Sequence, residues 1–228
     1  MERSAYLLAG PTASGKSAIA AALARGMGAR ILSADSMLVY KGMDIGTAKP
    51  PPEEIEEFGM GGVNLVTPAE EFSSGAWLRA AHTWLAGIPE ETPVIIVGGT
   101  GLYFSALLRG LDRAWEKPPP QYPVIKIDRA LVRQRIAERL DDMFMAGLED
   151  EKRRLHSLYP QWSRTAALAI GYREGDTKEK IYVRTCQLAK RQDTWFRHQS
   201  TPLYVEPSVD AVRTCWRTFG PWRIALKG

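Results

Sequence analysis

The sequence contains few cysteines and no long hydrophobic run. Only Cys186 and Cys215 occur among 228 residues. Two distant cysteines exclude a disulfide-rich scaffold and a cysteine-based zinc site, and they favour a reducing compartment. No apolar run approaches the ~20 residues that a membrane-spanning helix needs. The first residues also lack a charged segment followed by an apolar one, so we expect a cytoplasmic protein with no membrane partner.

The net charge of +4 is unevenly spread along the chain. Residues 1–120 hold 10 Lys and Arg against 13 Asp and Glu, whereas residues 121–200 hold 16 against 11. A basic second half fits a surface that faces nucleic acid, but solvated helix faces would give a similar count. Charge alone leaves both interpretations open.

Residues 10–17 carry the most informative pattern. They fit G-x-x-x-x-G-K-[ST], between an apolar run at 6–9 that predicts a strand and an alanine-rich run at 17–24 that predicts a helix. In such a loop the backbone N–H groups and the helix N-terminus bind phosphate, and a hydroxyl can hold Mg²⁺. The predicted diphosphate-binding residues are Gly10, Pro11, Thr12, Ala13, Ser14, Gly15, Lys16 and Ser17.

The order of predicted elements indicates an α/β fold, with a parallel sheet flanked by helices. We predict strands at 6–9, 29–33, 93–97, 124–127 and 203–205, and helices at 17–24, 73–85, 102–108, 130–158, 178–198 and 208–219. Leu131, Ile136, Leu140, Met143 and Leu148 form the apolar stripe of the 130–158 helix.

Consecutive prolines at 118–120 indicate a stiff linker. This divides the chain into a phosphate-loop α/β core over 1–111, a linker over 112–123, and a part over 124–228. That last part is expected to supply a further core strand and a helical surface packed on the same core.

Three segments are expected to meet at one edge of the sheet, because ligand sites in open parallel sheets lie beyond the carboxyl ends of the strands. They are residues 10–17, Asp35 with Ser36, and residues 98–101. Asp35 is placed to hold Mg²⁺ through water, to accept a proton or to cap the next turn. Thr100 either donates a hydrogen bond to a leaving diphosphate or stabilises its own turn.

The strand at 94–97 ends in Gly98. The acidic metal ligand that P-loop NTPases usually carry there is therefore missing, which favours a transferase over a motor or switch ATPase.

Six blocks of this sequence resemble the tRNA dimethylallyltransferases, also called tRNA isopentenyltransferases, and occur in that family's order. The phosphate loop is common to many families, whereas Asp-Ile-Gly-Thr-Ala-Lys-Pro and Lys-Arg-Gln-x-Thr-Trp-Phe-Arg are specific to this one. The blocks are residues 10–17, 33–40, 44–50, 97–103, 169–174 and 188–197.

The resemblance implies a P-loop NTPase-like fold and a reaction. The reaction is transfer of a dimethylallyl group from dimethylallyl diphosphate to N6 of adenosine 37, in tRNAs that read codons beginning with U. It implies that the phosphate loop holds this diphosphate rather than ATP. Asp35 would take the N6 proton, Lys16, Thr100 and Arg173 would steady the departing diphosphate, and Mg²⁺ would lie near Ser17.

The resemblance further implies a monomer that binds the anticodon stem-loop of tRNA. On a helix, Lys190, Thr194 and Arg197 would share a face that either binds RNA phosphates or is simply solvated. The implied tRNA-binding residues are Asp35, Ser36, Met37, Leu38, Gly171, Tyr172, Arg173, Lys190, Arg191, Gln192, Thr194, Trp195 and Arg197.

The chain departs from the family in three ways. The family usually has Gln where this chain has Leu38, and often Arg where it has Cys186. That Gln is expected to hydrogen-bond the target adenine, which leucine does not do. Residues 112–123 also stand where the family carries a long helical insertion.

These departures keep other functions open. A prenyltransferase acting on free adenine nucleotides, as in cytokinin synthesis, fits the short chain and Leu38. A catalytically impaired RNA-binding paralogue fits the same features. A nucleotide kinase fits the phosphate loop, but it would need paired arginines in a lid.

Overall fold

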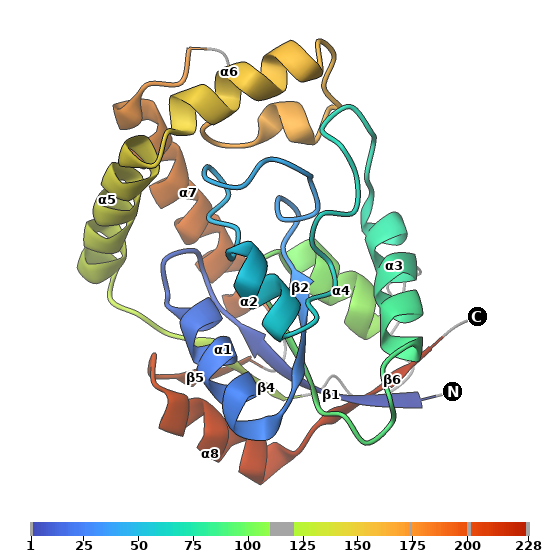
Figure 1. The fold of residues 1–228 in the computed structure, drawn as a ribbon. Coiled ribbons are helices and arrows are strands. Elements are labelled where there is room, and N and C mark those ends of the chain that lie inside the picture. The colour runs from blue at the N-terminus through green and yellow to red at the C-terminus, as the bar shows by residue number, and fades with distance from the viewer. Residues whose placement is uncertain (1, 110–120, 174, 200–201, 227–228) are drawn as a thin grey trace.

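The computed structural model describes residues 2–109, 121–173, 175–199 and 202–226 (Figure 1). Most of the linker predicted at 112–123 lies outside the described residues. Tyr122 and Pro123, which the sequence placed in that linker, belong to a strand. No helix within the described ranges is long and apolar enough to cross a membrane.

Among the described residues, five parallel strands and one antiparallel strand form the sheet and confirm the predicted α/β fold. Their order is β2-β3-β1-β4-β5, and β6 runs antiparallel to the first half of β1. In the register, Ala9 of β1 lies beside Gly98 of β3, which lies beside Ala34 of β2. The strands are β1 (Glu2–Ala9), β2 (Arg30–Ala34), β3 (Val94–Gly98), β4 (Tyr122–Ile125), β5 (Pro202–Val205) and β6 (Trp222–Ala225).

Helices cover both faces of the sheet, and strands β2, β3 and β4 are buried on both sides, whereas β5 and β6 are partly exposed. Leu8 and Ile95 point to the face covered by α1 (Lys16–Met27) and α8 (Val209–Phe219). Their neighbours Leu7 and Ile96 point to the opposite face, where α3 (Ser74–Ala86), α4 (Gly101–Arg109) and α7 (Lys178–Arg197) pack. The short helix α2 (Pro52–Glu57) has no buried residue.

The single helix predicted at 130–158 is wrong. Residues 129–158 form two helices, α5 (Arg129–Met145) and α6 (Leu148–Leu158), because Gly147 between them takes a left-handed conformation with φ of 96°. Leu131 of the predicted stripe is 37% exposed, and its neighbour Val132 is buried instead. In Figure 1, α5 lies beside α7, and α6 crosses above the loops that leave β2.

One strand of the structure is absent from the sequence prediction, and another lies two residues earlier than predicted. β6 is only four residues long, and no strand was predicted at 222–225. The strand predicted at 124–127 is shifted, since β4 spans Tyr122–Ile125. A short 3₁₀ turn at Ala166–Leu168 lies in the segment between α6 and α7.

Trp77 fixes the end of β2 beside the candidate site. This side chain of α3 is fully buried, stacks on Tyr103 at 4.5 Å between ring centroids, and donates from Nε1 to the Ser33 carbonyl at 3.1 Å. Ser33 lies two residues before Asp35, so the indole supports the strand end that carries the carboxylate.

We expect Trp77→Phe to lower the free energy of unfolding by about 1–3 kcal/mol, because the Ser33 carbonyl loses its buried donor. Urea denaturation measures the difference. Trp222→Phe, a partly exposed change on β6, is the control and should cost less. Equal effects of the two substitutions would contradict the importance of the buried bond.

Candidate active site

Residues 10–17 form a turn whose backbone wraps around a cavity at the N-terminus of α1. Ala13 and Gly15 have positive φ angles of 59° and 87°, and α1 begins at Lys16. Alternation of left-handed and right-handed residues makes a concave arrangement of N–H groups that suits an anion. The helix N-terminus adds positive potential at the same place.

Lys16 lies against this loop, and its Nζ donates to the Pro11 carbonyl at 3.2 Å. Burial lowers the pKa of Lys16 to about 8, while Asp35 opposes this effect and Arg139 adds to it. The charged ammonium group is shielded from water, so an anionic ligand bound beside it would stabilise its charge.

The three segments predicted to meet do so at the carboxyl edge of the sheet. The Gly10 N–H donates to the Gly98 carbonyl at 3.3 Å, and the Ser36 N–H donates to Thr100 Oγ1 at 3.0 Å. Asp35 Oδ1 accepts from the Met37 N–H at 2.9 Å. Asp35 thus also stabilises a local turn, as its simpler interpretation predicted, whereas the Thr100 hydroxyl binds the Ser36 loop rather than its own turn.

Two cavities adjoin at Asp35. The phosphate-loop cavity has a volume of about 330 Å³ and is lined by residues 12–17 except Ser14, by Leu38 and by Glu54, among others. The second cavity, of about 350 Å³, is lined by Met37, Thr100 and Arg173, among others. Four residues line both cavities, and they are Thr12, Asp35, Thr47 and Arg139.

Helix α5 places two arginines against the phosphate loop, and neither is among the site residues predicted from sequence. Arg139 Nη1 donates to Thr12 Oγ1 at 3.2 Å, and Arg135 Nη1 donates to the Ala13 carbonyl at 3.4 Å. Burial lowers the pKa of Arg139, but its guanidinium stays charged. Their spacing of four residues puts both on one helix face, but only the fold shows that this face covers the loop.

Arg173 lies at the second cavity, in the segment that precedes α7. Its guanidinium donates twice to the Leu168 carbonyl, at 3.1 and 2.7 Å. It lines the second cavity together with Thr100, and neither residue lines the phosphate-loop cavity. Arg139 is therefore the arginine that reaches the predicted diphosphate site in this structure.

Gln192 of α7 joins two of the converging loops. Its Oε1 accepts from the Thr12 N–H at 2.8 Å, and its Nε2 donates to the Gly99 carbonyl at 3.0 Å. One turn later, the Trp195 ring packs so closely on Gly101 that a Cβ there would lie 2.3 Å from the indole. The sequence predicted that both residues bind tRNA. In the structure, Gln192 holds two site loops by hydrogen bonds and Trp195 packs against one of them.

The remaining residues predicted to bind tRNA lie on different surfaces. Arg191 lines the second cavity, whereas Lys190 and Arg197 line a separate groove of about 960 Å³ on the opposite side of α7. Thr194 accepts a hydrogen bond from Arg197 at 3.4 Å. Tyr172 is only 1% exposed, and the neighbouring Gly171 is buried with a positive φ of 95°.

The described residues contain no group of three or more His, Cys, Asp or Glu side chains that could hold a metal ion. Ser17 and Asp35 nevertheless line the same phosphate-loop cavity. A hydroxyl and a carboxylate are the oxygen donors that Mg²⁺ prefers, and Mg²⁺ usually completes its shell with waters and substrate phosphates. The donor set therefore fits a Mg²⁺ ion held jointly with a diphosphate.

The sheet order, the phosphate loop and the adjoining cavities define the class as a P-loop NTPase-like α/β protein. A family model described as IPP transferase matches residues 38–123 and 112–199, and one described as isopentenyl transferase matches residues 3–60. The chain belongs to the tRNA dimethylallyltransferase family.

Relatives with that name support the assignment. The protein from Thioalkalivibrio sulfidiphilus is 33% identical over 86% of this chain and 88% of its own length. The protein from Nautilia profundicola is 31% identical over 85% and 92%. The protein from Phenylobacterium zucineum is 50% identical over 52% of this chain, but only 39% of that relative is covered.

Solved structures show the same fold. A full-length tRNA isopentenylpyrophosphate transferase from Bacillus halodurans superposes with a TM-score of 0.79 at 23% identity, over 94% of each chain. A eukaryotic dimethylallyltransferase described as acting on tRNA has a TM-score of 0.76 at 20% identity, over 95% of this chain and 76% of its own.

The lowered pKa of Lys16 predicts a pH dependence. Below about pH 8 the ammonium group is charged, and above it the group loses its proton, so affinity for inorganic pyrophosphate should fall as pH rises through 8. Calorimetric titration from pH 6.5 to 9.5 measures the change. Lys16→Met is the control, because pyrophosphate ionises in the same way in both titrations. If the affinities of the variant and the wild type change with pH in parallel, the assignment of the pH dependence to Lys16 is contradicted.

Arg139 should bind the diphosphate more strongly than Arg173. We expect Arg139→Gln to weaken pyrophosphate binding about 10- to 100-fold, because a charged hydrogen bond is lost inside a cavity. Arg173→Gln should change it less than threefold. Arg133→Gln, an exposed change on the same helix, is the matched control. An equal loss in Arg139→Gln and Arg173→Gln would contradict this placement.

Proposed function

We propose that this chain transfers a dimethylallyl group from dimethylallyl diphosphate to N6 of adenosine 37 in tRNA. The position of Asp35 is the observation that carries the proposal, because this carboxylate lines both adjoining cavities. A transferase needs one site for each substrate and a proton acceptor between them. Membership of the tRNA dimethylallyltransferase family supports the same reaction.

The donor diphosphate occupies the phosphate-loop cavity in this proposal. The backbone N–H groups of residues 13–17, the Lys16 ammonium and the Arg139 guanidinium supply positive charge there. When the C1–O bond breaks, the electron pair leaves with the diphosphate, and fixed donors stabilise this developing charge without reorganising. Ser17 would hold Mg²⁺, which neutralises part of the diphosphate charge when it is bound, and Asp35 would contact the ion only through water so that its carboxylate stays available as the base.

The acceptor adenine occupies the second cavity. Its N6 forms the new bond to C1 of the dimethylallyl group, and its proton passes to the Asp35 carboxylate. The hydrogen bond from the Met37 N–H orients this carboxylate. Because the exocyclic amine is a weak nucleophile, the two cavities contribute mainly by holding N6 and C1 close together.

Thr100 and Arg173 act on the acceptor side in this proposal, since both line the second cavity. Arg191 lies beside them and supplies positive charge for the RNA backbone. The groove with Lys190 and Arg197 on the far side of α7 offers a second basic surface for the anticodon stem. Nucleic-acid binding of this kind rests largely on phosphate contacts.

The chain carries out the reaction without most of the family's insertion. Alignment with the Thioalkalivibrio protein spans 283 positions, which exceeds the 228 residues of this chain and supports an internal deletion. Residues 2–109 and the part of the chain that begins at β4 then act as one core in this proposal. We further propose a monomer that works in the cytoplasm.

Leu38 lines the phosphate-loop cavity and not the second cavity, so in this proposal it packs on the donor side. Leucine has no hydrogen-bonding group, so the adenine contact expected of the family's glutamine is missing. Loss of such a contact reduces discrimination between bases by about 1–3 kcal/mol. A protein that prenylates free adenine nucleotides is the second candidate, and Leu38 is the observation that favours it.

Labelled dimethylallyl diphosphate with Mg²⁺ tests the proposal. We expect label to enter unmodified tRNA that carries A36 and A37, and we expect Asp35→Asn to transfer at least 100-fold more slowly because the amide accepts no proton. Asp35→Asn keeps an oxygen for the Met37 N–H, so its fold should survive.

Two other outcomes change the conclusion. Label that enters AMP and not tRNA assigns the chain to the nucleotide-prenylating class. A folded protein that binds pyrophosphate and tRNA but labels neither substrate is the catalytically impaired paralogue.

A further inference from the structure

The segment that follows β2 contributes directly to both cavities. Thr47 lines both, Gly46 lines the second cavity, and Ala48 and Pro50 line the phosphate-loop cavity. These residues belong to the family-specific block at 44–50, here called the 44–50 loop. The loop contains no helix or strand, so contacts with other elements must fix its shape.

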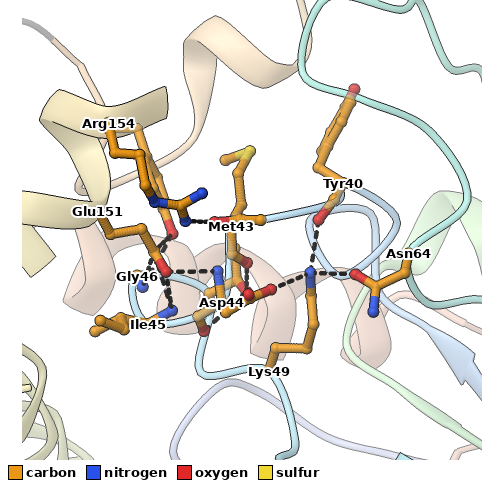
Figure 2. A network of polar contacts seen from close by, with 12 residues as sticks. Tyr40, Met43, Asp44, Ile45, Gly46, Lys49, Asn64, Glu151 and Arg154 are labelled. Atoms are coloured by element: carbon orange, nitrogen blue, oxygen red, sulfur yellow. Dashed lines mark hydrogen bonds and ion pairs between the residues drawn. The ribbon is translucent and has the colours of Figure 1, made fainter. Parts of the chain in front are cut away.

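Glu151 of α6 binds the backbone at the start of this loop. Its carboxylate accepts from the N–H groups of Asp44 at 3.1 Å, Ile45 at 3.0 Å and Gly46 at 3.3 Å, as Figure 2 shows. The residue is only 6% exposed and forms no ion pair with any described residue. A buried carboxylate needs such donors, and three successive backbone N–H groups provide them.

Tyr172 belongs to the same hydrogen-bonded cluster and joins Glu151 to Gly46. Its hydroxyl donates to Glu151 Oε1 and accepts from the Gly46 N–H at 3.0 Å. Burial, followed by the adjacent Glu151, raises the pKa of Tyr172, so the hydroxyl keeps its proton. The ring also approaches Gly46 so closely that a Cβ there would lie 2.6 Å from it.

Lys49 fastens the other end of the loop. Its side chain is 2% exposed, and Nζ donates to the Tyr40 carbonyl at 2.6 Å and to Asp44 Oδ1 and Asn64 Oδ1 at 2.7 Å each (Figure 2). Between the two anchors, Ala48 has a positive φ of 52°, a conformation that alanine rarely adopts. The loop is therefore held in a conformation that it would not adopt alone.

We propose that Glu151 and Tyr172 are positioning residues that hold residues 46–48 as the wall between the two cavities. The inference rests on the proposed function for its effect on catalysis, whereas the contacts themselves exist without it. Neither side chain lines the two cavities, so both act through the 44–50 loop. The sequence predicted that Tyr172 binds tRNA. In this proposal it instead holds Gly46, which lines the acceptor cavity.

Three variants test this role. Tyr172→Phe removes only the hydroxyl that joins Glu151 to Gly46. Glu151→Gln replaces one carboxylate oxygen by an amide N–H₂ that faces the N–H donors of the loop. Glu149→Gln makes the same chemical change on the same helix at a half-exposed side chain near Lys152, and is the matched control.

Hydrogen exchange gives a readout that does not depend on activity. We expect the amides of residues 44–46 to exchange about tenfold faster in Glu151→Gln and severalfold faster in Tyr172→Phe, with no change in Glu149→Gln. We also expect kcat/KM for transfer to tRNA to fall about tenfold. Affinity for inorganic pyrophosphate should stay within twofold, because the phosphate loop does not contact Glu151.

The proposal is overturned if residues 44–46 exchange at the wild-type rate in both folded variants, or if kcat/KM is unchanged while exchange rises. It is also overturned if exchange rises across the whole chain and pyrophosphate affinity falls equally, because the two residues would then only stabilise the fold. A wild-type protein that labels no substrate overturns the proposed function instead, and local exchange with pyrophosphate binding still decides whether Glu151 and Tyr172 hold the loop. Should Glu151→Gln fail to fold, Tyr172→Phe decides alone.

Discussion

The parallel pairing of β1, β3 and β2 is the constraint on which the site depends. Because Ala9, Gly98 and Ala34 lie side by side, the chain leaves all three strands at one edge of the sheet. The phosphate loop, the turn at Thr100 and Asp35 follow these residues directly. Hydrogen bonds from Gly10 to Gly98 and from Ser36 to Thr100 then join the three loops. A shift of register in either pairing would separate them.

The sequence predicted the parts of the site that follow directly from local pattern. The phosphate loop, Asp35 and Thr100 each stand just after an apolar strand, and parallel pairing brings them together. Arg139, Glu151 and the support role of Gln192 were not found, because their partners in the loops are 93 to 180 residues away. A buried Glu151 looks, in sequence, like any other charge on a polar helix. The break at Gly147 was missed since apolar spacing continues across it.

The two loops of the site differ in whether their buried charges have partners. Around the phosphate loop, Lys16 and Arg139 bring positive charge into a cavity, which is unfavourable until an anion arrives. Around the 44–50 loop, every charge already has a partner, because Glu151 and Lys49 meet backbone groups and neutral or opposite side chains. Positive charge without an ion pair among the described residues is thus concentrated where a diphosphate would bind, whereas the charges in the wall beside that site are already paired.

The pairing of β1 with β6 ties the first strand to one of the last. Glu2 to Ala5 pair with residues 222–225, and Trp216 of α8 donates to the Leu7 carbonyl across the same central strand. On the ribosome, β1 emerges long before β6 and α8, so its first half has no strand partner until residues 222–225 have been made. The second half of β1 can pair with β3 much earlier, but residues 2–5 stay an open strand edge until β6 emerges. Protection of that edge during synthesis is a requirement that this topology places on the cell.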